Sequence, residues 1–179
     1  MRKALEIGGV LAGAVLIVFG IIAIYMGVDG RNTVRDSLKQ EKIVGTPDSS
    51  IPGKAVDSGD RARAFAAVMR KHTLEATSGK TYSEMGRFLD AQGNPTNDQN
   101  LAAKDAKGQP VENGLRNLWV TETALTTALN MSYMAEQLSL FGIVVGVALL
   151  LAGVGFIVLA LAGAVRRTES EKAAKAAAA

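Results

Sequence analysis

The chain has 179 residues, with 20 lysines and arginines, 17 aspartates and glutamates, one histidine and no cysteine. Disulfides are therefore excluded, which fits an exported region that folds without them. The formal charge of +3 is small, and its distribution points to a membrane rather than to nucleic acid.

Two long runs without a charged residue lie at residues 7–26 and 137–165. An α-helix rises about 1.5 Å per residue, so roughly 20 apolar residues cross a hydrocarbon core about 30 Å thick. Neither run has the polar face of a soluble core helix. We therefore predict transmembrane helices over residues 7–26 and 138–165.

The first run favours a retained anchor over a cleaved signal peptide. The hydrophobic part of a signal peptide spans only about 7–15 residues. The end of the run, AIYMGVDG, also offers no convincing small-x-small cleavage site. We expect this helix to stay in the mature protein.

The charges predict how the two helices are oriented. Residues 27–136 contain 14 basic and 14 acidic side chains, so the entire excess of +3 lies near the two termini. Basic residues close to membrane spans favour the cytoplasmic side. We therefore expect residues 1–6 and 166–179 in the cytoplasm and residues 45–116 as a small extracytoplasmic domain, and we expect no nucleic-acid partner.

Both helices are predicted to continue outside the lipid. Val34 and Leu38 have helical i,i+4 spacing, which extends the first helix to about residue 43, before Gly45 and Pro47. Residues 117–137 form a helical stalk that runs into the second span without a break. The predicted fold is a mainly α membrane protein: an antiparallel two-helix transmembrane hairpin with long helical extensions and a small, loop-rich extracytoplasmic domain.

Small residues recur every seven positions in both spans. Small residues let helix backbones approach closely in lipid, where hydrophobicity gives helices no drive to associate. A seven-residue repeat suits a shallow left-handed crossing. Glycine is also common in membrane helices generally, and packing within one chain or between two copies both remain open. The predicted helix-packing residues are Gly13, Gly20, Gly27, Ser139, Gly146, Gly153 and Ala160.

The middle region is predicted to contain one helix over residues 60–78. Asp57 or Ser58 suits its N-cap and Gly79 its C′ position. One face is predicted to carry Phe65, Met69, His72 and Ala76. Turns are expected around Gly93 and Gly108, no internal repeat is apparent, and the alanine-rich tail is expected to be frayed or disordered.

His72 is the only imidazole and therefore the only base of that kind available for catalysis. Nucleophilic triads need a base beside a serine or cysteine, and metal sites commonly gather three or four ligands. Glu75 is the one carboxylate predicted on the same face. We therefore predict no catalytic residue, no metal ligand and no bound cofactor.

Residues 90–101 alternate polar side chains in a way that resembles a calcium loop. An EF-hand requires glycine at position 6 and glutamate at position 12, and these positions hold Pro95 and Leu101. A polar turn is the better interpretation. Tyr25 and Tyr133 suit the membrane interface, whereas Trp119 is predicted to lie in the core of the small domain.

Four long stretches of the sequence are distinctive: MRKALEIGGVLAG, GRNTVRDSLKQEKIVGTPD, FAAVMRKHTLEATSGKTY and NLWVTETALTTALNMSYMAEQLSLFGIVVGVALLLAGVGF. They resemble a family of actinobacterial two-pass membrane proteins whose members are often labelled aromatic ring-opening dioxygenases. The resemblance covers most of residues 1–161 and implies a two-pass topology in a bacterial cell membrane. The 2-His-1-carboxylate iron site of non-haem oxygenases needs two histidines, so the residues do not support the label.

From these observations we expect a non-enzymatic integral protein of the cell membrane. It would present its exported region to a membrane-protein partner, an envelope complex or a second copy. Two alternatives remain open, an extracytoplasmic ligand sensor and an enzyme with the dioxygenase activity. The tail after Val165 has 14 residues and leaves no room for an output domain, which argues against a sensor.

Overall fold

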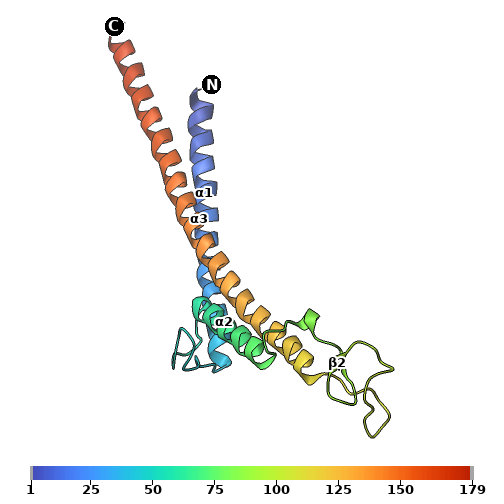
Figure 1. The fold of residues 1–179 in the computed structure, drawn as a ribbon. Coiled ribbons are helices and arrows are strands. Elements are labelled where there is room, and N and C mark those ends of the chain that lie inside the picture. The colour runs from blue at the N-terminus through green and yellow to red at the C-terminus, as the bar shows by residue number, and fades with distance from the viewer. Residues whose placement is uncertain (1, 178–179) are drawn as a thin grey trace. The chain divides into compact units, whose positions relative to one another are not determined.

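The computed structural model describes residues 2–177 and is mainly helical (Figure 1). Residue 1 of the predicted N-terminal segment and residues 178–179 of the predicted tail lie outside the described residues. In chain order, the elements are α1 (Arg2–Gln40), α2 (Gly59–Ala76), the 3-10 helix η1 (Tyr82–Glu84), β1 (Phe88–Leu89), β2 (Pro95–Thr96) and α3 (Gly114–Ala177).

The chain divides into two compact units. The helix-pair unit consists of the N-terminal segment up to Thr33 and the C-terminal segment from Glu136. The small unit consists of residues 34–135. Both α1 and α3 contribute residues to each unit.

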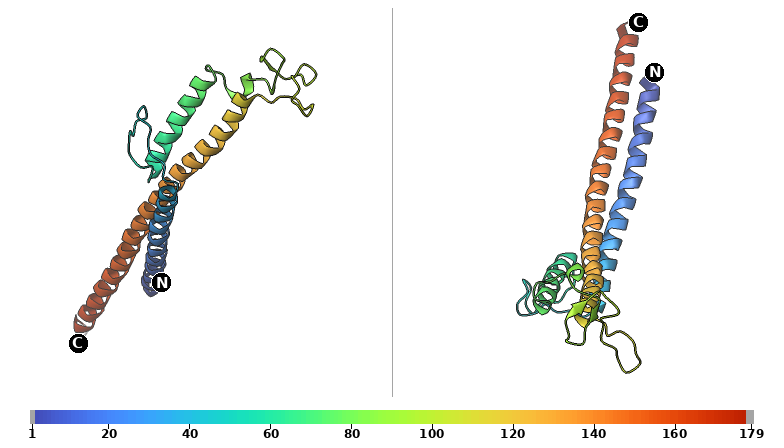
Figure 2. Two further views of the ribbon diagram at one scale, coloured as in Figure 1. Left: turned by 90° about the horizontal axis from the view of Figure 1, so that it is seen from below. Right: turned by 45° about the vertical axis from the view of Figure 1, so that its right-hand side comes forward.

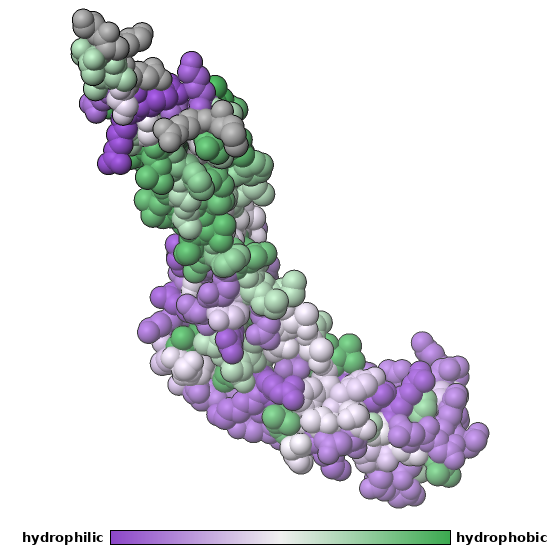
Figure 3. All heavy atoms as spheres, turned by 90° about the horizontal axis from the view of Figure 1, so that it is seen from above, coloured by the Kyte–Doolittle hydropathy of each residue, from purple (hydrophilic) through white to green (hydrophobic). Residues whose placement is uncertain are grey.

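In the helix-pair unit, α1 and α3 lie side by side and run antiparallel, with both termini at the same end of the pair (Figures 1 and 2). Both helices are long and apolar enough to cross a membrane, and only 11% of the residues in each apolar window are buried. A core helix of a soluble protein would be mostly buried. Figure 3 shows the resulting hydrophobic surface, with hydrophilic residues beside it near the termini.

Both long helices differ from their predicted ends. The first helix is predicted to reach about residue 43 but ends at Gln40, because Lys42 has a φ of 53° and leaves the right-handed region. α3 is unbroken, as predicted, but the expectation of a frayed tail is wrong, since the helix continues to Ala177. The tail is rich in alanine, lysine and glutamate, which are good helix formers, and it extends an existing helix without a new nucleus.

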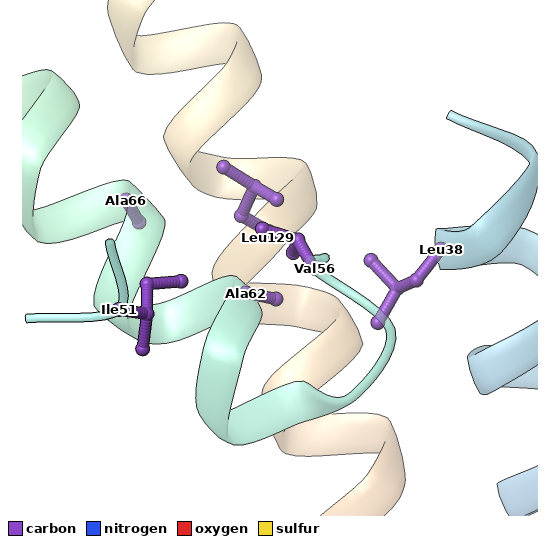
Figure 4. Close-up of a cluster of buried hydrophobic side chains, with 6 residues drawn as sticks. All are labelled: Leu38, Ile51, Val56, Ala62, Ala66 and Leu129. Carbon is purple, nitrogen blue, oxygen red and sulfur yellow. The ribbon is translucent and has the colours of Figure 1, made fainter. Parts of the chain in front are cut away.

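The core of the small unit joins three helices to the segment between α1 and α2 (Figure 4). Val34, predicted to share a face with Leu38, packs against this core from α1. The connecting segment folds back on itself through a bridge between Val44 and Ala55. Val56, at 1% exposure, is the most completely buried large side chain of the core. One cluster of buried residues in this core consists of Leu38, Ile51, Val56, Ala62, Ala66 and Leu129.

The ends of α2 lie close to their predicted positions, with one correction at the C-terminus. Ser58 is the N-cap residue. At the other end, the N–H of Gly79 donates to the carbonyl of Leu74 and the N–H of Ser78 to that of Glu75, which is a Schellman motif. Ser78, with a φ of 53°, therefore occupies C′, and Gly79 follows at C″.

The four residues predicted to share one face of α2 have different surroundings. Phe65 and Met69 pack against the core, whereas His72 and Ala76 are exposed. The buried residues of α2 are Gly59, Ala62, Ala66, Val68 and Thr73. Small residues at these positions let the helix lie close to its neighbours.

Residues 87–113 form a small β region with two nearly identical turns. Asp90 and Asp105 each open a turn in which their Oδ1 accepts the N–H groups two and four residues later, at 2.7–2.9 Å. Gly93 and Gly108 have φ values of 83° and 75°. The predicted turns are therefore present, but the statement that no repeat exists is wrong, because DAQGNP and DAKGQP are one motif repeated 15 residues apart.

Trp119 lies in the core of the small unit, as predicted, with 3% of its surface exposed. Its Nε1 donates to the Lys80 carbonyl at 3.0 Å, and the guanidinium of Arg70 lies 5.2 Å from the centre of its ring. A buried indole N–H needs such a partner. These contacts attach the start of α3 to the segment after α2.

Candidate functional site

α1 and α3 approach each other through opposed glycines in the helix-pair unit. A Cβ added to Gly13 would lie 2.6 Å from the carbonyl oxygen of Gly153, and one added to Gly20 would lie 2.7 Å from that of Gly146. The reverse additions, at Gly153 and Gly146, give the same distances. Real Cβ atoms essentially never come within 3.0 Å of a neighbour. Neither pair therefore has room for a side chain.

We call this line of close contacts between α1 and α3 the seam. It continues toward both ends of the helix pair. A Cβ on Gly27 would lie 2.6 Å from the Ser139 carbonyl oxygen, and one on Gly9 would lie 3.1 Å from Cβ of Ala160. Gly30, which the repeat did not single out, faces the Ser139 hydroxyl at 2.9 Å. The structure thus brings all the sequence-selected residues together between two segments of a single chain.

The seven-residue spacing describes the seam better than the four-residue GxxxG spacing does. A Cβ on Gly142 would find only an ordinary contact, 3.8 Å from the Ala23 carbonyl. Ile17 and Ile24 instead place side-chain carbons 2.8 and 2.7 Å from the Cβ positions of Gly153 and Gly146. A large side chain on one helix thus fills the space that each glycine leaves on the other, as in coiled-coil packing.

An ion pair joins α1 and α3 on either side of their uncharged stretches. Arg31 Nε lies 2.9 Å from Glu136 Oε1, and the Glu136 side chain is 6% exposed. Arg167 Nη1 lies 2.7 Å from Glu6 Oε2, with side chains 23% and 18% exposed. Charge-assisted hydrogen bonds of this kind are strong when partly shielded from water. The two ion pairs fix the position of α1 along α3. The only indication of these pairs in the sequence is that charged residues lie close to the ends of each apolar run.

His72 has a partner that cannot be identified from the sequence alone. Its Nε2 lies 2.8 Å from Oδ2 of Asp48, which precedes it by 24 residues. Lys71 Nζ lies 3.0 Å from the same oxygen. All three side chains are between 41% and 53% exposed. The cluster ties the segment before α2 to the surface of that helix, and this accounts for His72 in structural terms.

This cluster shifts two pKa values. Hydrogen bonds from His72 and then from Lys71 hold the pKa of Asp48 well below its usual range. The same contact raises the pKa of Lys71, because the Asp48 carboxylate stabilises its charged form.

The loop predicted to be a polar turn rather than a calcium site uses its first carboxylate internally. Asp90 accepts hydrogen bonds from the backbone of Asn94 and Gln92 and from the Asn94 side chain. The backbone bond from Asn94 is the main reason that the pKa of Asp90 is lowered. Its oxygens thus complete the turn.

The two tyrosines have different surroundings. Tyr25 is 72% exposed at the end of the first apolar run. Tyr133 lies under the guanidinium of Arg63, 4.8 Å from the ring centre, which is a cation–π contact in the small unit.

Among the side chains that the structure describes, no group of three or more histidines, cysteines, aspartates or glutamates lies close enough to hold a metal ion. No family model, curated protein or solved structure matches the chain. What the geometry of the seam and its two ion pairs can do is hold two apolar helices together while their large side chains face outward, among them Leu11, Phe19, Phe141 and Leu151 at 61–70% exposure.

The Asp48 cluster gives a prediction about pH. The pKa of Asp48 is lower in the folded protein than its ordinary value of 3.8, so its stabilising effect is complete above that value and is lost as the pH falls below it. Replacing Asp48 with asparagine should lower the thermal midpoint at pH 7, and the difference from the unmodified protein should shrink below about pH 4.

The control is Glu41→Gln, which removes an exposed acid from the same connecting segment; within the described residues Glu41 has no ion pair. Thermal unfolding of both variants across pH measures the effect. A difference for Asp48→Asn that persists unchanged to pH 2 would show that the carboxylate is not responsible.

Proposed function

We propose that the protein is a non-enzymatic integral protein of the cell membrane, in which α1 and α3 cross the bilayer as an antiparallel hairpin. One observation carries this proposal: the uncharged stretches of both helices pack through glycines on one side and leave their large apolar side chains exposed on the others. In water such a surface would aggregate, because monomeric soluble proteins rarely expose large contiguous apolar patches. In lipid it is the expected outer surface.

Both termini are assigned to the cytoplasm in this proposal. The whole excess of positive charge lies outside residues 27–136, and basic residues beside membrane spans favour that side. Residues 45–116 then form an extracytoplasmic domain carried on helical extensions. The Arg31–Glu136 and Glu6–Arg167 pairs would lie near opposite surfaces of the bilayer.

The proposed role is that of a structural or accessory protein that presents this domain to a membrane-protein partner or to a second copy. In the small unit, α3 carries a stripe of exposed apolar or small residues at helical spacing: Val120, Ala124, Thr127, Met131 and Met134. Val120, Met131 and Met134 are 55–61% exposed. Flexible methionines on an exposed face suit a surface that binds another protein.

The resemblance to actinobacterial two-pass membrane proteins supports the location and supplies no reaction. A ring-opening dioxygenase that used the 2-His-1-carboxylate site would need two histidines, and the chain contains only His72. The proposal therefore excludes that activity. Iron present in stoichiometric amount in the purified protein and lost on His72→Ala would contradict this part.

The orientation can be tested with single cysteines, since the chain has none of its own. Ser50 and Ala173 are both exposed. On intact cells, an impermeant thiol reagent should label Ser50→Cys and should label Ala173→Cys only after the membrane is broken. The reverse pattern would overturn the orientation, and labelling of both on intact cells would overturn the hairpin.

The accessory role can be tested by co-purification from crosslinked membranes in mild detergent. We expect the protein to carry a defined membrane protein or a second copy in constant proportion, and expect Met131→Gln with Met134→Gln to lose most of it. Leu101→Gln is the matched control, because Leu101 is 64% exposed but lies outside the stripe. A protein that purifies alone, or equal loss in the control, would contradict the role.

A further inference from the structure

A groove with a volume of about 1140 Å³ opens between α1 and α3 at the terminal end of the helix-pair unit. The two helices spread apart toward this end (Figures 1 and 2). Gly8 and Gly163 both line the groove, and a Cβ added to either would meet nothing within 4 Å. The groove is larger than most small-ligand pockets, which measure roughly 300–1,000 Å³.

The lining of the groove changes in character along the helices. Its inner part is apolar and is formed by Gly9, Ala12, Phe156, Leu159 and Gly163. Its outer part contains Glu6, Arg166, Arg167 and Ser170. The change falls where the uncharged run of α3 ends, at Val165. In the proposed hairpin this is the depth at which lipid chains give way to headgroups.

The charge of the outer part is not balanced within the groove. Glu6 is occupied by Arg167, with Nη1 and Oε2 2.7 Å apart. Arg166 is exposed, and it makes no ion pair with any side chain that the structure describes. One positive charge therefore remains at the mouth of an apolar groove. An arginine guanidinium binds phosphate through paired hydrogen bonds, which makes it a suitable headgroup ligand.

We infer that this groove binds one anionic phospholipid of the cytoplasmic leaflet, with its phosphate at Arg166 and the start of an acyl chain against the apolar inner part. The inference rests on the proposed membrane location and adds a ligand to it. Cytoplasmic leaflets are negatively charged, and basic pockets between membrane helices on that side bind anionic headgroups.

A second copy of the chain fits this groove less well than a lipid does. Two copies related by a twofold axis would bring the same Arg166 residues toward each other, and like charges at an interface are unfavourable. The apolar part is also lined by glycine and alanine of both helices, which leaves a channel suited to a flexible chain.

The test uses the full-length protein in detergent and native mass spectrometry, with dioleoyl-phosphatidylglycerol, dioleoyl-phosphatidylcholine and glycerol phosphate as separate probes. Arg166→Gln removes the charge, and Lys172→Gln removes an equal charge from the same tail outside the groove lining. Gly163→Leu fills the groove. Gly155→Leu is its control, because a Cβ there also meets nothing within 4 Å and the residue does not line the groove.

We expect one phosphatidylglycerol to bind saturably, and to bind about fivefold more weakly in Arg166→Gln, the effect of one basic residue near a lipid surface. Gly163→Leu should abolish this adduct, the two controls should retain it, and glycerol phosphate alone should not bind. Equal binding of the two lipids, equal loss in Lys172→Gln, or a dimer lost in Gly163→Leu without any lipid adduct would overturn the inference.

These outcomes are separable from those of the proposed function. The cysteine-labelling pattern and co-purification do not require a bound lipid, and lipid selectivity in detergent does not require a partner. Correct topology with no selective adduct would reject the groove alone. A selective adduct with reversed topology would reject the orientation and assign the lipid to the other leaflet.

Discussion

The close approach of two backbones at opposed glycines is the constraint on which the helix-pair unit depends. Two apolar helices in lipid gain nothing from hydrophobic burial against each other, so contact distance decides whether they associate. Gly13 and Gly20 of α1 face Gly153 and Gly146 of α3 with no space for a Cβ between them. Dispersion contacts that are individually small then add up along the seam. The ion pair at each end fixes which glycines meet.

The rest of the unit follows from this arrangement. With the glycines turned toward each other, the large side chains face outward and form the apolar surface seen in Figure 3. Where the seam ends, the helices separate and leave the groove beside Arg166. The proposed membrane anchor and the proposed lipid site both depend on where the small residues stop. The small unit has a separate core and keeps its own fold through it.

The sequence could predict features that depend on local spacing and could not predict those that depend on distant pairing. The uninterrupted α3 and the seven-residue repeat of small residues are local patterns, and both are present. The Glu6–Arg167 pair requires the register between two helices separated by most of the chain, and the His72–Asp48 contact requires a folded loop. The repeated DAQGNP and DAKGQP turns were visible in the sequence, but their shared role follows only from the hydrogen bonds that both aspartates accept.

The central claim, that the seam lies within one chain in the membrane, is tested most directly by a disulfide across it. Gly9→Cys with Ala160→Cys joins positions whose Cβ atoms would lie 3.1 Å apart, a few tenths of an ångström from disulfide geometry. Gly8→Cys with Ala160→Cys is the control, because a Cβ at Gly8 meets nothing within 4 Å. In oxidised membranes the first pair should give a crosslinked monomer protected from alkylation, and the control should stay reduced. Covalent dimers, or no disulfide in the first pair, would contradict the account.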